Sequence, residues 1–90
     1  MTLQSRTLEI TNRRGLHARA SAKFVNLASN LAAQVEVEKD GNRVCGTSIM
    51  GLMMLGAAMG DAIVIHAEGD GAEASIERLV ELVENRFGED

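Results

Sequence analysis

The spacing of apolar residues changes repeatedly along this chain, and these changes limit its possible folds more than any other feature. Leu8 and Ile10 alternate with polar neighbours, which is the two-residue period of a half-buried strand. From Ala18 onward the spacing becomes three or four residues, which predicts an amphipathic helix ending near Ser29 or Asn30. Its apolar stripe comprises Ala20, Phe24, Leu27, Ala28 and Leu31.

The second half of the chain repeats this change of period. Val35 and Val37 alternate with glutamates, and the "DG" pair at residues 40 and 41 provides the backbone freedom of a tight hairpin before "NRVCG" returns. "TSIMGLMMLGA" predicts a short helix capped by Thr47 or Ser48. "DAIVIHA" is nearly continuously apolar, which indicates a strand inside a sheet. The last helix has the clearest stripe, formed by Ala72, Ile76, Leu79, Val80, Val83 and Phe87.

The predicted order is therefore strand, helix, strand, strand, helix, strand, helix. No two strands are joined by enough chain to form a repeated βαβ unit, so we expect a mostly antiparallel sheet with helices on one face, an α+β two-layer sandwich. Ninety residues with 46% hydrophobic content predict a single domain spanning residues 1–90.

Composition and charge exclude several classes of function. The net charge of −4 and the lack of Trp and Tyr argue against a nucleic acid partner. No apolar run approaches the ~18 residues of a membrane span, and the first residues lack the apolar core of a signal peptide. Cys45 is the single cysteine, which fits a reducing compartment. We therefore expect a cytoplasmic protein that contacts neither nucleic acid nor membrane.

Metal sites are also not expected. His66 has no Cys, Asp or second His at ligand spacing, so we assign it a structural role in its strand. The glutamates of the last helix and the "EGDG" segment are explained by a solvated helix face and a turn.

The segment "RRGLHARASAKF" contains the strongest candidate for chemistry, because it places His17 at or beside the N-cap of the first predicted helix. The first amides of a helix have no internal partner and favour an anion. An imidazole nitrogen is a nucleophile towards phosphorus, and Arg19 would add donors that match a phosphate. The segment therefore predicts a place where a phosphoryl group is held on His17 and then leaves. A simpler interpretation, that His17 only caps the helix, stays open.

Two motifs carry a resemblance to a known family. "GLHARASAKF" resembles the active-site signature of HPr, the histidine-containing phosphocarrier protein of the bacterial phosphoenolpyruvate-dependent phosphotransferase system. "TSIMGLMMLGA" is similar to the regulatory-serine segment of HPr proteins that are controlled by a kinase. The resemblance covers nearly the whole chain. It implies an open-faced sandwich, β-α-β-β-α-β-α, with four antiparallel strands in the order 1-4-2-3 and three helices on one face.

The resemblance also implies roles for particular residues. His17 would accept phosphate through Nδ1 from phospho-Enzyme I and pass it to a downstream phosphotransferase acceptor, while Arg19 steadies the phosphate. Ser48 would be the regulatory site modified by HPr kinase/phosphorylase. The protein would then be a carrier rather than an enzyme, without a cofactor, and we expect a monomer. The family usually has proline where this chain has Ala20, a change that removes a rigid element but no donor or charge.

The short methionine-rich helix predicts a docking surface for partner proteins. One sheet face cannot cover all its apolar residues, so we expect Ile49, Leu52 and either Met53 or Leu55 to turn inward and Met50 and Met54 to lie near the surface. The surface itself is predicted to contain Leu16, Ala20, Ile49, Met50 and Met53.

Three alternatives to an HPr carrier stay open. "EITNRRGLHAR" and the acidic "RFGED" end also resemble the nitrogen-branch relative of HPr, which acts mainly as a regulator. A small phosphohydrolase with His17 as nucleophile is disfavoured, because the motif shows no base that would activate water. A non-catalytic interaction domain is the third.

Overall fold

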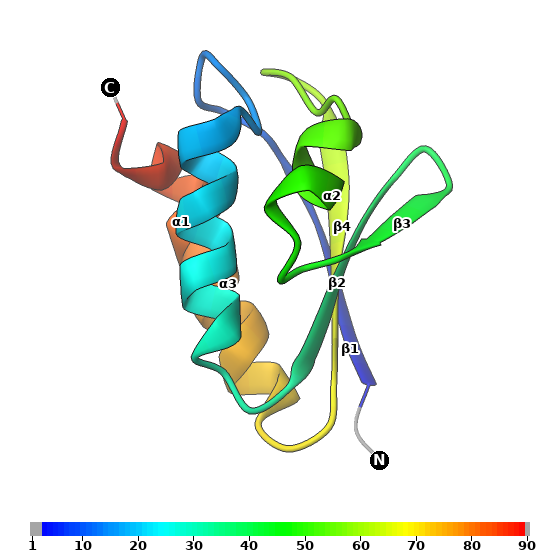
Figure 1. The fold of residues 1–90 in the computed structure, drawn as a ribbon. Coiled ribbons are helices and arrows are strands. Elements are labelled where there is room, and N and C mark those ends of the chain that lie inside the picture. Colours follow the sequence, from blue (N-terminus) through cyan, green and yellow to red (C-terminus); the bar gives the residue numbers. More distant parts are fainter. Residues whose placement is uncertain (1–2, 90) are drawn as a thin grey trace.

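The computed structural model describes residues 3–89, which contain four strands and three α-helices (Figure 1). In chain order these are β1 (Leu3–Glu9), α1 (Ala18–Ser29), β2 (Gln34–Lys39), β3 (Asn42–Cys45), α2 (Ile49–Met54), β4 (Ala62–Glu68) and α3 (Ala72–Glu84). A short 3₁₀ turn, η1 (Arg86–Gly88), follows α3. The predicted order of elements is confirmed. The last letter of "RFGED", Asp90, lies outside the described residues.

The four strands form one antiparallel sheet in the order β1-β4-β2-β3. The three helices lie on one face of this sheet, and the other face is open (Figure 1). β4 is an interior strand, as its apolar run predicted. Its side chains alternate between buried and half-buried because helices cover only one face. The predicted open-faced sandwich is therefore confirmed.

The core lies between the sheet and the helices. Ile63 and Ile65 of β4 meet the buried stripes of α1 and α3 there. All six residues of the predicted last stripe are buried, but Phe87 lies beyond the end of α3. Arg86 and Phe87 have φ values of 56° and 55°, so the backbone reverses after the helix while the Phe87 ring stays in the core. This reversal turns the following residues back towards α1.

Two details differ from the sequence predictions. β1 ends at Glu9, and Ile10 is buried just beyond it, where its amide bonds to the Asp61 carbonyl. Leu52 of α2 and Leu55, the C-cap of that helix, turn inward as expected, but Ile49 is 41% exposed. The six residues of α2 make fewer than two turns, so only a narrow stripe reaches the core.

Within residues 3–89, no helix has the length and apolar character needed to cross a membrane.

Candidate functional site

His17 is the N-cap of α1, as the sequence predicted. Its backbone is extended, and Nδ1 of its ring accepts a hydrogen bond of 3.2 Å from the Arg19 amide. The Ser21 amide bonds to the His17 carbonyl at 2.9 Å, which begins the helical ladder. The imidazole thus takes the capping position that a Ser, Thr, Asn or Asp side chain usually fills.

A tight turn over residues 12–15 fixes the position of His17. The Gly15 amide donates to the Asn12 carbonyl at 3.2 Å, and the Leu16 amide donates to the Ala57 carbonyl at 3.0 Å. Gly15 has a φ of 62°, and a Cβ at this residue would lie 2.2 Å from the Ala57 oxygen. Glycine is therefore required, both for the backbone conformation and for the close approach to the neighbouring loop.

The second ring nitrogen of His17 is paired with the C-terminal tail. Nε2 is hydrogen-bonded to Oε2 of Glu89, while Oε1 of Glu89 accepts a bond of 3.0 Å from the Asn12 side-chain amide. The same Asn12 nitrogen donates to the Gly15 carbonyl at 2.9 Å. The His17 and Glu89 side chains are only 16% and 17% exposed. The tail and the turn therefore form one hydrogen-bonded unit around the imidazole.

The hydrogen bond from Asn12 lowers the pKa of the Glu89 carboxyl, and this outweighs the opposite effect of burial. The hydrogen bond from His17 and the positive charges of His17 and Lys23 lower this pKa further. Glu89 is therefore a carboxylate at neutral pH.

These partners assign the protonation of the neutral ring. A backbone amide can only donate a hydrogen bond, so Nδ1 must offer its lone pair to the Arg19 amide. A carboxylate can only accept, so Nε2 must carry the proton that is shared with Glu89. Nδ1 is thus the ring nitrogen that holds a lone pair and could act as a nucleophile, and it faces the amides that open α1, where an anion is favoured.

Arg19, Arg13 and Arg14 add positive charge around the start of α1. All three are exposed, and none of their side chains forms an ion pair with another of residues 3–89. Their guanidinium groups are available to an anion on Nδ1 or to an acidic partner surface.

Ser48 is the N-cap of α2. Its Oγ accepts a hydrogen bond of 2.9 Å from the Gly51 amide, so of the two hydroxyls that the sequence offered, Ser48 is the cap. The residue is half-buried, and α2 packs against α1.

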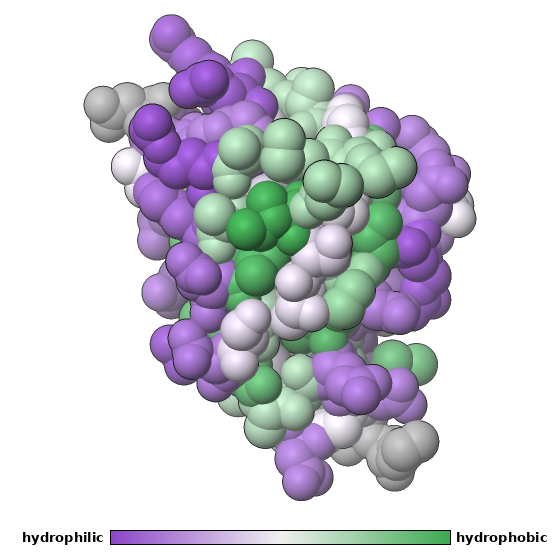
Figure 2. Space-filling view, in the orientation of Figure 1, coloured by the Kyte–Doolittle hydropathy of each residue, from purple (hydrophilic) through white to green (hydrophobic). Residues whose placement is uncertain are grey.

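The residues around Ser48 form an exposed apolar surface, which we call the methionine patch: Ile49, Met50, Met53 and Met54. Met50 and Met54 are 72% and 78% exposed. Figure 2 shows apolar atoms gathered on this side of the molecule, over α2 and its surroundings. Leu16 and Ala20 do not belong to it, contrary to prediction. They are 5% and 0% exposed, because the Leu16 amide is tied to Ala57 and Ala20 lies on the inner stripe of α1.

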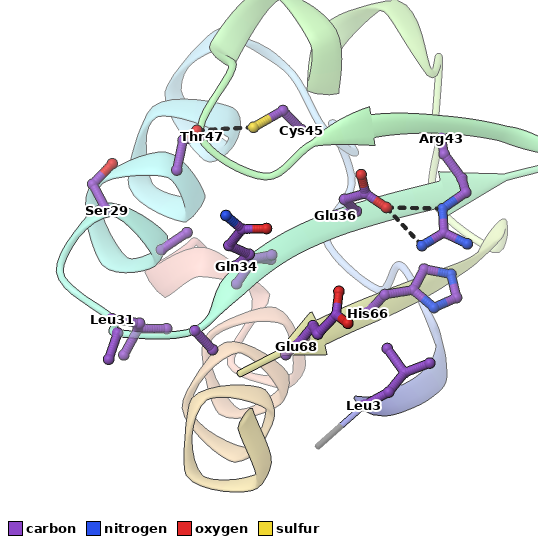
Figure 3. Close-up of a pocket in the computed structure, with 15 residues that line it drawn as sticks. Leu3, Ser29, Leu31, Gln34, Glu36, Arg43, Cys45, Thr47, His66 and Glu68 are labelled. Carbon is purple, nitrogen blue, oxygen red and sulfur yellow. Dashed lines mark hydrogen bonds and ion pairs between the residues drawn. The ribbon is translucent and has the colours of Figure 1, made fainter. Parts of the chain in front are cut away.

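A hollow at the other end of α1 is lined by none of the predicted site residues (Figure 3). Ser29 and Leu31 line it together with parts of the sheet. The 12 residues of α1 span about 18 Å, which separates this hollow from His17. On the open face of the sheet, His66 is hydrogen-bonded to Ser5 at 2.7 Å and to Glu38 at 2.9 Å. No three His, Cys, Asp or Glu side chains within the described part of the chain are placed to hold a metal ion.

Two residues of the site were not predicted from the sequence, Asn12 and Glu89. Asn12 lies at the first position of a tight turn, where Asn is common, and this signal was available. Glu89 is 72 residues from His17 in the sequence, and no local pattern connects the two.

Comparison with known proteins adds independent information. The family model described as the PTS HPr component phosphorylation site matches residues 4–85. Phosphocarrier protein HPr of Cupriavidus necator is 43% identical, over 93% of this chain and 94% of that protein. Phosphocarrier protein NPr of Shewanella violacea is 35% identical, over 99% and 98% respectively. A crystal structure of HPr from Thermoanaerobacter tengcongensis has a TM-score of 0.92 and 47% identity, and the match covers 97% of this chain and 98% of that one.

Proposed function

Because this chain belongs to the HPr family of phosphocarrier proteins, we propose that His17 carries the phosphoryl group, taking it from phospho-Enzyme I and passing it to a downstream acceptor. Its relatives are carriers in the phosphotransferase system rather than enzymes, so the group is moved and not turned over. The observation that carries this proposal is the orientation of the ring, because Nδ1 holds a lone pair at the start of α1.

The transfer step uses groups already present at this helix start. The Nδ1 lone pair attacks phosphorus, the new N–P bond forms, and the donor atom keeps the electron pair of the bond that breaks. The amides of Ala18 and Ala20 have no partner within the helix and can hold phosphoryl oxygens. The Arg19 amide, which donates to Nδ1 in the unmodified protein, becomes free to join them once the Nδ1 lone pair is used in the N–P bond. The Arg19 guanidinium adds charge-assisted donors from the surface.

Glu89 bears on the phosphohydrolase alternative, since it places a carboxylate at the site. Both of its oxygens are already engaged, and it pairs with Nε2 rather than with the nitrogen that would carry phosphate. It is therefore not positioned to activate water at phosphorus, and a carrier is favoured.

Control by phosphorylation of Ser48, through HPr kinase/phosphorylase, is part of the same proposal. Enzyme I would dock on the methionine patch, which begins at the residue after Ser48. A phosphate there adds about −1.5 to −2 charges at the edge of an apolar surface, where it opposes docking. The hydrogen bond from the Gly51 amide to Ser48 Oγ accounts for the start of the short helix α2, but it does not account for the exposed methionines beside Ser48.

A nitrogen-branch carrier is the second candidate, and the similarity to NPr over 99% of the chain supports it. The chemistry on His17 would be the same and only the acceptor would differ. The HPr of Cupriavidus necator is more similar to this chain, at 43% against 35% identity, so we rank the HPr carrier above the nitrogen-branch carrier. Transfer from the phosphorylated protein to a sugar-specific acceptor and to a nitrogen-branch acceptor, measured side by side, separates the two. For either, we propose a cytoplasmic monomer.

The proposal is tested by incubating the protein with Enzyme I and phosphoenolpyruvate and measuring the mass shift. We expect one acid-labile, base-stable phosphate in the parent, none in His17→Ala, and an undiminished shift in the control His66→Ala. Arg19→Ala should be phosphorylated about 5-fold more slowly and unfold at the parent's temperature, because an exposed Arg contributes little to stability. Arg78→Ala, on the outer face of α3, is its control. A full mass shift in His17→Ala contradicts the proposal.

A further inference from the structure

The C-terminal tail is anchored at three points before it reaches His17. Phe87 is buried in the core at 1% exposure, and its carbonyl accepts a hydrogen bond of 2.6 Å from the Lys23 side chain. Asn12, itself fully buried, then holds Oε1 of Glu89. The backbone reversal at Arg86 and Phe87 makes all of these contacts possible. The carboxylate is therefore placed on the imidazole by the fold.

We propose that Glu89 is a positioning residue for phosphoryl transfer, which keeps the proton on Nε2 and so keeps Nδ1 as the free nucleophile. This inference rests on the proposed function of His17. An imidazole without a partner at Nε2 exchanges between two neutral tautomers, and only one of them has a lone pair at Nδ1. The Arg19 amide favours that tautomer from one side of the ring, and Glu89 favours it from the other.

Glu89 also balances charge during the transfer. As the N–P bond forms at Nδ1, the ring keeps its proton at Nε2 and takes on positive charge. The carboxylate lies against that proton and stabilises the charged ring. When the phosphoryl group leaves for the acceptor, the electron pair of the N–P bond returns to Nδ1 and the ring is neutral again. Glu89 acts through His17 and does not touch phosphorus.

The position of the contact between Glu89 and His17 favours a positioning role for Glu89 over a role in which the tail blocks the histidine. Glu89 occupies Nε2, on the other side of the ring from the amides of α1, and leaves Nδ1 facing the helix start. A blocking tail would be expected on Nδ1 itself. The blocking role is nevertheless one of the outcomes that the experiment below distinguishes.

The experiment compares Glu89→Ala and Glu89→Gln with the parent and with Glu84→Ala, which removes an exposed carboxylate at the end of α3. Nitrogen-15 NMR of the His17 ring reports the tautomer, and single-turnover phosphorylation by phospho-Enzyme I reports the rate. In the parent and in Glu84→Ala we expect the Nε2–H tautomer. In Glu89→Ala we expect a mixture of tautomers, about tenfold slower transfer and an unfolding temperature lowered by no more than a few degrees. In metal sites, loss of the partner that orients a histidine ligand costs about 10–100-fold in affinity or activity, and we expect an effect at the low end of that range here. Glu89→Gln should behave like Glu89→Ala, because its amide can donate as well as accept.

Three results would overturn the inference. Faster transfer in Glu89→Ala would show that the tail blocks His17 instead of positioning it. An unchanged tautomer and rate would leave Glu89 without a role. Parent-like behaviour of Glu89→Gln would show that contact alone is sufficient and the charge is not needed. If the parent accepts no phosphate at all, the proposed function fails, while the ring spectrum of the unmodified protein still decides whether Glu89 sets the tautomer.

Discussion

His17 and Ser48 occupy the same structural position in two different helices. Each is an N-cap with extended backbone, and each accepts a hydrogen bond from an amide in the first turn of its helix. The difference lies in what else holds the side chain. The His17 ring is bonded at both nitrogens, to its own helix and to the C-terminal tail. The Ser48 hydroxyl has one such bond, to Gly51, and apolar residues follow it on the surface.

Under the proposed function, this difference would let one capping geometry serve two purposes. A group that must react through one chosen atom needs its orientation fixed from several sides, and three segments of the chain converge on His17 to do so. A group that is only to be modified by another protein needs access, and Ser48 sits on a short helix at the surface. Changes to the supports of His17 should therefore affect chemistry, whereas changes at Ser48 should affect docking.

The largest effect should come from Gly15→Ala, which attacks the support of His17 and leaves Ser48 alone. The new Cβ would meet the Ala57 carbonyl, and the left-handed backbone adds about 1–2 kcal/mol, so we expect a loss of about 3 kcal/mol in the free energy of unfolding by urea. Gly56→Ala is the matched control, because Gly56 has a φ of 65° but no atom within 4 Å of its Cβ. Gly56→Ala should therefore lose only about 1–2 kcal/mol, which comes from placing a side chain on left-handed backbone. Equal losses in the two variants would contradict the close-approach explanation.

A smaller effect is expected at Ser48, and it should appear in rate rather than in fold. Ser48→Asp keeps a capping acceptor and should unfold like the parent, yet accept phosphate from Enzyme I about tenfold more slowly, which is about 1.4 kcal/mol of docking free energy. Ser48→Ala should lose about 1 kcal/mol of stability and transfer normally. If the two variants transfer at the same rate, Ser48 is a cap and nothing more. The nitrogen-branch candidate would then gain support.

The smallest effect on stability should be seen on acidification. Lowering the pH affects only the cap at His17, because that cap is paired with a carboxylate and the cap at Ser48 is not. The folded pKa of Glu89 is lowered, so its contribution is complete above the unfolded value of about 4.3 and is lost as the pH falls through the still lower folded value. We expect the Asn12 side-chain amide signals to shift only in that acid range, with less than about 1 kcal/mol of stability involved. The Gly51 amide at Ser48 should not follow this titration. A shift of the Asn12 signals in Glu89→Gln over the same range would assign it to another group.

Much of the fold was predictable because its signals are local. The change of apolar period gave the order of the elements, and the positive φ values of Asp40 and Gly41 agree with the expected hairpin. The surrounding residues placed His17 at or beside the first cap and left the second cap between Thr47 and Ser48. The exposure of Ile49 was not predicted, because periodicity says which residues share a helix face but not how much of that face a helix of fewer than two turns can bury.

Tertiary contacts account for what was missed at the site. Phe87 fits the stripe of α3, which suggested a longer helix, but its ring reaches the core after the backbone has reversed. Nothing in the sequence near residue 89 signals that reversal. The docking prediction failed at Leu16 and Ala20 for a related reason, since the order of the elements brings these residues to the same end of the sheet as α2 but does not show that their side chains turn into the core.

The course of the tail has a practical consequence for handling the protein. The chain reaches Glu89 beside the start of α1, whereas Leu3 lies at the opposite end of the sheet, near the residues that follow α1 (Figure 1). An affinity tag or reporter domain joined after residue 89 would therefore emerge next to the histidine and pull on the segment that holds its proton. The same fusion joined before residue 3 would emerge far from it, so recombinant material for kinetic work is better tagged at the amino end.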